Sequence, residues 1–167
     1  MTPADFEPFL ALSRRKTLEL LDHISKLPDP RAVLGWRPGP GRAHLAWQFM
    51  HVAATEDRHV HVRMKGGEAK EPELVRRFAG GSTPDDDIPD VAAIRKYLDD
   101  RRQELLAHMR TLSAADLDRK PNEAAQWNYR DWFQILTWHE GHHHGQAHIT
   151  FNLYRMAHDP TMAKVGH

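Results

Sequence analysis

Apolar side chains recur every three or four positions along four stretches of the chain, which is the period of an α-helix. The stretches cover about residues 3–26, 42–64, 88–112 and 128–156. The stripe of the first stretch consists of Phe6, Leu10, Ser13, Thr17, Leu20, Ile24 and Leu27. Nowhere do apolar and polar residues alternate as they do in a half-buried strand. The pattern predicts an all-α protein with four long helices, for which an antiparallel-type bundle is the default architecture.

Two of the segments between these helices contain residues that interrupt helices. Residues 28–41 are rich in proline and glycine and surround Trp36, so we expect a loop there. The connection at about 65–87 is longer than most, and we expect a short helical turn at Glu73–Phe78. Connections of more than about 12–15 residues are usually functional or disordered, which makes this one a candidate lid or crossover. We expect the last helix to end before His158-Asp159-Pro160.

Length and charge narrow the possible functions. A chain of 167 residues is the size of one domain, which we expect to span residues 1–167. Lys and Arg number 23 and Asp and Glu also 23, so the chain lacks the basic excess of a nucleic-acid-binding protein. No apolar run is long enough to span a membrane. The first residues do not resemble a secretory signal, which favours a cytoplasmic location.

Histidine is unusually abundant, with 13 residues, and two of them lie four apart on the apolar face of the last predicted helix. With His139 at zero on a helical wheel, His143 falls about 40° away. The same arc holds Trp132, Ile135, Leu136, Gln146, Thr150 and Leu153. His144 and His148 fall on the other side with Glu140, where we expect a solvated helix surface.

Two neutral imidazoles on a core face cannot satisfy each other's hydrogen bonds well, and burying imidazolium would cost more. A divalent metal that binds both nitrogens removes this cost, and imidazole suits zinc, nickel or iron. Hydrogen bonds from His139 and His143 to polar groups of other helices are the alternative. Because the chain has no cysteine, a thiolate zinc site and a cysteine nucleophile are excluded.

A third ligand must come from another helix, and the second predicted helix carries several histidines. His51 is central in this helix and flanked by apolar residues, whereas His59 and His61 lie near its polar end. The helix is apolar around much of its circumference, so periodicity alone does not show whether His51 points inward. We take His51 as the candidate third ligand because the pair on the last helix needs one.

Three segments together resemble the DinB/YfiT-like superfamily. They are Trp36-Arg-Pro-Gly-Pro-Gly41, His51-Val-Ala-Ala-Thr-Glu56 and His139-Glu-Gly-His-His143-His-Gly-Gln146. The resemblance extends from the first helix to about residue 156. It implies a four-helix bundle that runs up-down-down-up with a long connection between helices 2 and 3. It also implies one divalent metal per chain, zinc or nickel, held by residues that map onto His51, His139 and His143.

Characterised members of the superfamily with this site resemble thiol S-transferases. The resemblance therefore implies a low-molecular-weight thiol, an electrophile as its acceptor, and a homodimer. Under this reading we expect Lys70, Arg76 and Arg77 near the mouth of the pocket, where they would meet carboxylates of the thiol. A solvated loop is the alternative for these three residues. Gln146 could contact a ligand or serve as an ordinary packing residue of the helix. Arg58 could meet a substrate carboxylate, but we expect it to form a surface salt bridge instead.

A second reading starts from His139-Glu140-Gly-His-His143, which satisfies the H-E-x-x-H pattern of zinc peptidases with Glu140 as general base. The chain has no glutamate after Glu140 to act as a downstream ligand, and no strand to hold an extended peptide. Peptidase activity is therefore disfavoured. Hydrolysis by metal-bound water and a non-catalytic metal-binding protein of the stress response remain as alternatives.

Overall fold

The computed structural model describes residues 1–159, and within this range the chain is helical and contains no strand. Four helices are long: α1 (Glu7–Ser25), α3 (Leu45–Asp57), α5 (Val91–Met109) and α6 (Tyr129–His158). The shorter elements are η1 (Pro3–Phe6), α2 (Pro30–Gly35), the π-helix η2 (Arg58–Met64), α4 (Pro72–Arg77) and η3 (Ala114–Asp118). The predicted all-α class is confirmed.

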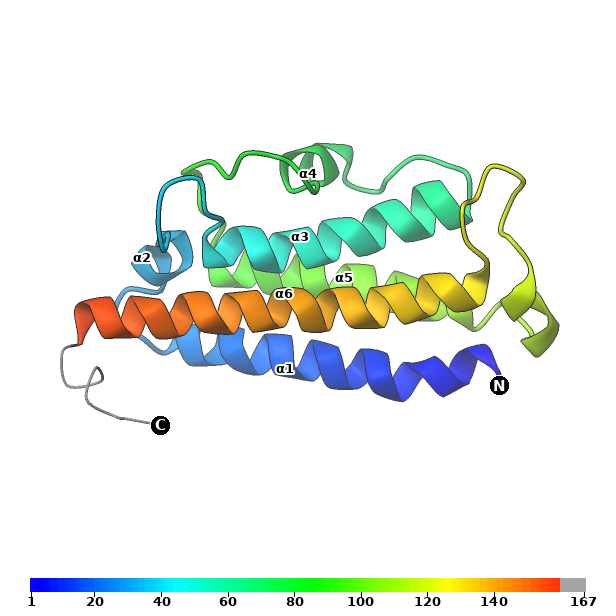
Figure 1. Cartoon of the computed structure of the whole chain (residues 1–167), viewed down its shortest axis with the longest axis horizontal. Coiled ribbons are helices and arrows are strands. Elements are labelled where there is room, and N and C mark those ends of the chain that lie inside the picture. The colour runs from blue at the N-terminus through cyan, green and yellow to red at the C-terminus, as the bar shows by residue number, and fades with distance from the viewer. Residues whose placement is uncertain (160–167) are drawn as a thin grey trace.

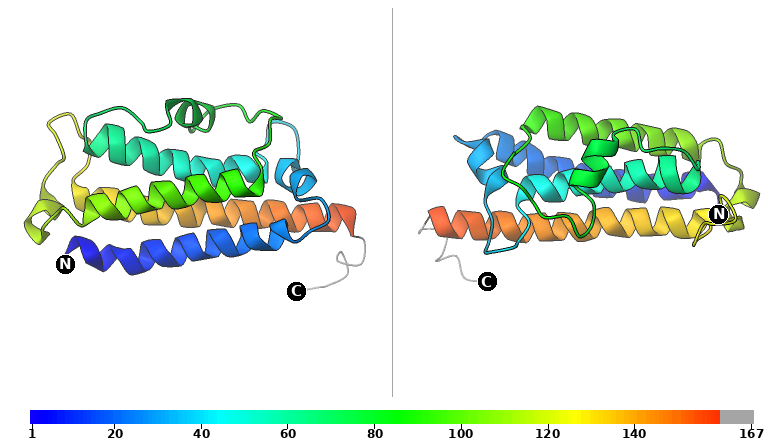
Figure 2. Two further views of the ribbon diagram at one scale, coloured as in Figure 1. Left: turned by 180° about the vertical axis from the view of Figure 1, so that it is seen from behind. Right: turned by 90° about the horizontal axis from the view of Figure 1, so that it is seen from above.

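The four long helices lie side by side (Figure 1), with both α1 and α3 packed against α5 and α6. The colours show that α1 and α6 run in one direction and that α3 and α5 run in the opposite one (Figures 1 and 2). The segment that contains α4 crosses over α3 and returns the chain from the end of η2 to the start of α5. This connection places α4 beside α3, with which it makes contact.

Side-chain caps set the beginnings of the helices. The Nδ1 atom of His44 accepts a hydrogen bond from the Trp47 N–H at 3.0 Å, so α3 begins at Leu45 rather than near residue 42. Asp90 and Asn128 cap α5 and α6 in the same way. Helix α6 ends at His158, slightly beyond the expected end near residue 156, and Pro160 lies outside the described residues.

The proline-rich segment at 28–41 is not entirely a loop, because it contains α2. The Asp29 side chain accepts a hydrogen bond from the Ala32 N–H, and Pro30 occupies the first helical position. Proline at this position loses no helical hydrogen bond and supplies a helical φ. A reading of prolines only as helix breakers therefore missed this short helix. The turn expected at Glu73–Phe78 is present as α4.

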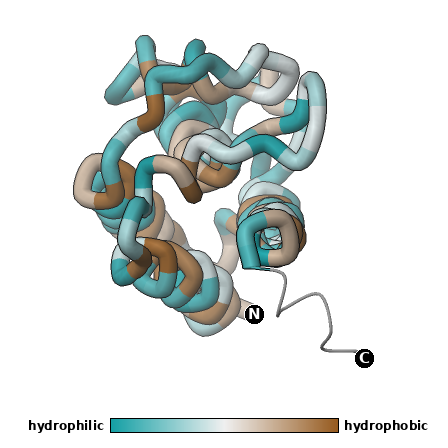
Figure 3. The backbone as a smooth tube through the Cα atoms, turned by 90° about the vertical axis from the view of Figure 1, so that its left-hand side faces the viewer, coloured by the Kyte–Doolittle hydropathy of each residue, from teal (hydrophilic) through white to brown (hydrophobic). Residues whose placement is uncertain are grey.

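The core lies between the four long helices, and the end-on view shows hydrophobic and hydrophilic residues on different sides of the helical tubes (Figure 3). Its fully buried side chains include Leu10, Leu21, Phe49, Leu98, Leu105 and Phe133. Trp132, Leu136 and Thr150 are buried as the wheel of the last helix predicted, but Leu153 is 41% exposed. Leu153 lies in the last turns of α6. Periodicity predicts which face of a helix is apolar, but it does not predict how far along the helix the neighbouring helices cover that face. None of the described helices is both long and apolar enough to cross a membrane.

Four charged side chains, one from each long helix, form an ionic cluster in the core. Arg14 of α1 donates to Glu140 of α6 at 2.8 Å and to Glu56 of α3 at 3.1 Å. Arg102 of α5 donates to Glu56 at 2.9 Å and also to Glu140. All four residues are at most 6% exposed. Because each guanidinium meets both carboxylates, the cluster is neutral and links all four helices.

The burial of Glu140 corrects the expectation of a solvated surface around it. On the wheel it lies away from His139, but α1 and α5 each present an arginine to that position. The two arginines hold the pKa of the Glu140 carboxyl below its ordinary value, although burial alone would raise it.

Candidate metal centre

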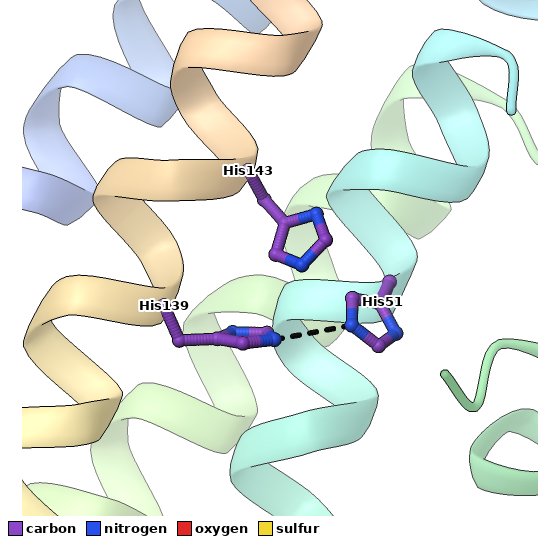
Figure 4. Close-up of side chains that lie close together, drawn as sticks. All are labelled: His51, His139 and His143. Carbon is purple, nitrogen blue, oxygen red and sulfur yellow. Dashed lines mark hydrogen bonds between the residues drawn. The ribbon is translucent and has the colours of Figure 1, made fainter. Parts of the chain in front are cut away.

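Three histidines converge between α3 and α6 (Figure 4). One ligand atom of each of His51, His139 and His143 lies within 4.8 Å of the corresponding atoms of the others. The Nε2 atoms of His51 and His139 are 3.1 Å apart, and the ring of His143 lies 4.4 Å from both other rings, centroid to centroid. The structure thus brings together the three residues that the sequence proposed as metal ligands. No other group of this kind occurs among residues 1–159.

Burial of α3 decides the orientation of His51, which the sequence left open. Every residue from Leu45 to Ala54 is buried, because α5 and α6 pack on α3 and the α4 segment covers it. The His51 ring is 7% exposed and stacks on the Trp47 ring at 4.6 Å with an interplanar angle of 8°. Trp47 therefore covers one face of the His51 ring, and Nε2 of His51 points to His139 of α6.

Outer hydrogen bonds determine which nitrogen of two of the rings carries the proton. The Nδ1 atom of His51 lies 2.6 Å from the carbonyl oxygen of Phe78, and that of His143 lies 2.6 Å from Oε1 of Gln48. Both partners are acceptors, so in each ring Nδ1 carries the proton and donates it. The lone pair of each ring is then on Nε2, which is the arrangement usual for metal-bound histidine.

The environment keeps the three imidazoles neutral. Burial, reinforced by the neighbouring histidines, lowers the pKa of His139 and of His143 to about 3. Burial also lowers the pKa of His51, against the opposing effect of its hydrogen bond to Phe78. Neutral imidazole is the form that binds metal, so these side chains need no deprotonation at pH 7.

The residues fit a divalent ion. In the absence of a cation, the close approach of His51 and His139 requires a proton on Nε2 of His139, because Nε2 of His51 has none. A divalent ion would bind all three lone pairs in place of that proton. A set of three histidines leaves a further coordination position for water or a ligand, as in catalytic rather than structural zinc sites.

Comparison of the sequence with models of known protein families gave a match. The family model described as DinB superfamily matches residues 10–147, which includes all three histidines and most of the four long helices. The chain belongs to the DinB superfamily. This is a metal-binding superfamily, and the three-histidine group of this member could hold a metal ion. Neither the curated proteins nor the solved structures gave a match.

A pocket of about 270 Å³ opens onto the histidines of this DinB protein. His51 and His139 form part of its wall. The remainder comes from Ala54, Thr55, Arg58, His59, Val75, Ala79 and Gly80. A methyl group added at Gly80 would lie 3.7 Å from Cε1 of His51, so an alanine at this position would just touch the ring.

Lys70, Arg76 and Arg77 do not line this pocket, which agrees with the alternative of a solvated loop rather than with a position at its mouth. Arg77 pairs with Asp85 at 2.7 Å and with Asp87, and Arg76 pairs with Glu73. Val75 and Ala79 face the pocket instead. Both arginines lie in the last turn of α4, directly after Val75. The Val75 side chain lines the pocket, whereas those of the two arginines do not.

The other histidines of α6 lie outside the metal centre. His144 and His148 stack on each other at 6.1 Å and line a groove against α1. His142 is exposed and stacks on Trp138, and the Gln146 amide lies 2.6 Å from its Nε2. Gln146 therefore contacts His142 rather than His143.

Two contacts of the centre were not anticipated from the sequence, namely Gln48 and the Phe78 carbonyl. Gln48 precedes His51 by three residues, which places both on one side of a helix and was a usable signal. A backbone carbonyl from another segment, such as that of Phe78, leaves no mark in the sequence.

The position of Glu140 removes the basis for a zinc-peptidase mechanism. A general base must lie within hydrogen-bond reach of the water that it activates. The Glu140 carboxylate instead pairs with Arg14 and Arg102 in the core. The sequence thus contains the H-E-x-x-H pattern, but its glutamate forms buried ion pairs between helices instead of facing the candidate metal centre.

Proposed function

We propose that this DinB protein binds one divalent metal ion per chain, zinc or nickel, through His51, His139 and His143, and that it joins a low-molecular-weight thiol to a small electrophile. The observation that carries the proposal is the set of three neutral imidazoles at the wall of a pocket, with outer nitrogens of two of them held by Phe78 and Gln48. The resemblance of the sequence to the thiol transferases of the superfamily supplies the reaction class.

A bound divalent ion would supply a Lewis acid that lowers the pKa of a thiol. The overall reaction forms a sulfur–carbon bond, releases the leaving group of the electrophile and gives the thiol proton to solvent. The protein has no cysteine, so the thiol is a substrate. Val75 and Ala79 give one side of the pocket an apolar wall, and the hydrogen bonds of His51 and His143 keep their rings from rotating.

We also infer that the four long helices form the up-down-down-up bundle that the family resemblance implies, in one domain. The helix directions and the long connection over α3 support this inference. A homodimer is expected from the same resemblance, and light scattering on the purified protein would test it.

Turnover measurements test the proposed reaction. Bacillithiol, mycothiol and glutathione are each combined with a chromogenic halo-aromatic electrophile and with metal-loaded protein, metal-free protein or His143→Ala. We expect metal-dependent turnover with one thiol and none above background in His143→Ala. Metal-dependent ester or amide cleavage without any thiol transfer would favour a hydrolase, and metal binding without either activity would favour a non-catalytic role.

A further inference from the structure

Arg58 is an exposed arginine on the wall of the pocket that opens onto the three histidines. His51, Thr55 and Arg58 follow one another at intervals of four and three residues, so they lie along one side of the helix. Arg58 is also the residue at which α3 passes into the π-helix η2. π-Helical turns are rare and frequently occur at functional sites.

The carboxylates next to Arg58 in the sequence are not available to neutralise it. Glu56 pairs with Arg14 and Arg102 in the core. Asp57 is 1% exposed, contacts Arg101 at 3.4 Å, and accepts hydrogen bonds from the Lys70 and Glu71 N–H groups. Within residues 1–159, Arg58 has neither an ion pair nor a hydrogen bond from its side chain. Its guanidinium is therefore free to bind a ligand.

The other residues that line the pocket also favour binding of an anion. No aspartate or glutamate lines it, and Thr55 adds a hydroxyl group one helical turn before Arg58. The volume of about 270 Å³ accommodates a small ligand or the reactive end of a larger one. A guanidinium matches a carboxylate with two parallel hydrogen bonds, which fixes orientation as well as position.

We propose that Arg58 binds the carboxylate of a small substrate and so directs the reactive end of that substrate toward the three histidines. The inference rests on the proposed function for the identity of the substrate, which is either the thiol or the electrophile. In both cases the shared requirement is a carboxylate within reach of Arg58, with uncharged atoms against Ala54, Val75 and Ala79.

Two matched pairs of ligands test this proposal on the zinc-loaded protein by isothermal titration calorimetry. N-acetylcysteine and its amide represent the thiol, and a chloro-nitrobenzoate and the corresponding benzamide represent the electrophile. We expect the wild type to bind one acid about tenfold more tightly than its amide, as for one charged, bidentate contact. The pair that shows the preference identifies which substrate carries the carboxylate.

Substitutions at Arg58 assign the preference to its guanidinium. Arg58→Gln should abolish the difference between acid and amide and leave the affinity for the amide unchanged. Arg58→Lys should retain part of it. Arg63→Gln is the matched control, because Arg63 is another exposed arginine of η2 that does not line the pocket. Zinc content, measured in parallel, should be the same in all four proteins.

The outcomes separate this inference from the proposed reaction. An acid preference that persists in Arg58→Gln would overturn the inference, since the metal itself would then bind the carboxylate. Equal loss in Arg63→Gln, or no binding of either acid to the wild type, would also overturn it. Arg58-dependent binding without thiol transfer would support the inference and refute the transferase, whereas transfer that is equally fast with acid and amide would do the reverse.

Discussion

Glu140 directly follows His139 in the sequence, yet the two side chains belong to different sites. The His139 ring joins His51 and His143 at the candidate metal centre, with its Nε2 3.1 Å from that of His51. The Glu140 carboxylate lies in the core, 2.8 Å from Nε of Arg14. Successive residues of a helix point about 100° apart. One turn of α6 therefore contributes His139 to the candidate metal centre and Glu140 to the ionic cluster that links the four helices.

Metal content should depend on three of the histidines and not on their neighbours. We expect about one divalent ion per chain in the wild type, and loss of most of it in His51→Ala, His139→Ala and His143→Ala, because each removes one ligand. Elemental analysis after removal of loosely bound metal measures this. His148→Ala is the control, since His148 lies on the same helix but outside the centre. Equal retention in all four variants would show that the metal binds elsewhere.

The hydrogen bond from His143 to Gln48 should matter for metal affinity. Gln48→Ala removes the acceptor that orients the His143 ring, and loss of such an outer contact typically costs about 10–100-fold in affinity. Competition with a chromophoric chelator gives the dissociation constant. Gln146→Ala is the matched control, because Gln146 contacts His142 and not a member of the centre. We expect its affinity to equal that of the wild type, and a comparable loss in both variants would contradict the assignment.

Removal of the Glu140 charge should lower stability. Among residues 1–159, Glu140→Gln leaves Arg14 and Arg102 with Glu56 as their only carboxylate, and breaking a buried ionic group in this way costs about 3–5 kcal/mol in the free energy of unfolding. Urea denaturation measures the loss. Glu123→Gln, at an exposed position, should be within about 0.5 kcal/mol of the wild type. If Glu140 were a general base, its replacement would instead abolish activity while leaving stability nearly intact.

The stability of the metal-free protein should depend on pH through the buried histidines. The pKa of His139 and of His143 is about 3 in the folded protein, below the ordinary value of 6.5. Between these limits the unfolded chain binds protons that the folded chain does not, so the free energy of unfolding decreases as the pH falls from about 6.5 toward 3. Thermal unfolding of chelator-treated protein at several pH values measures this decrease. The dependence should be shallower in His143→Ala, and an unchanged slope would argue against burial of the neutral ring.

The sequence by itself determined the helical class, the positions of the long helices and the pairing of His139 with His143. These features are local, because helical periodicity and a spacing of four residues both depend only on residues of a single helix. Even α2 had a local signal, in an aspartate cap followed by proline at the first helical position. His51 was chosen as the third ligand because the pair on the last helix needs one more, and the family resemblance supported that choice, but no local pattern connects His51 to α6.

Only the tertiary structure decided what each helix face meets. A wheel of α6 separates Glu140 from His139, but it cannot show that α1 and α5 present Arg14 and Arg102 to the same point. Likewise, the sequence left open whether Lys70, Arg76 and Arg77 lie at the pocket or in a solvated loop, whereas in the packed protein Val75 and Ala79 line the pocket and Arg58 is the arginine on its wall. The free energy of a buried charge depends on partners far away in the chain, so its environment is known only when the helices are packed.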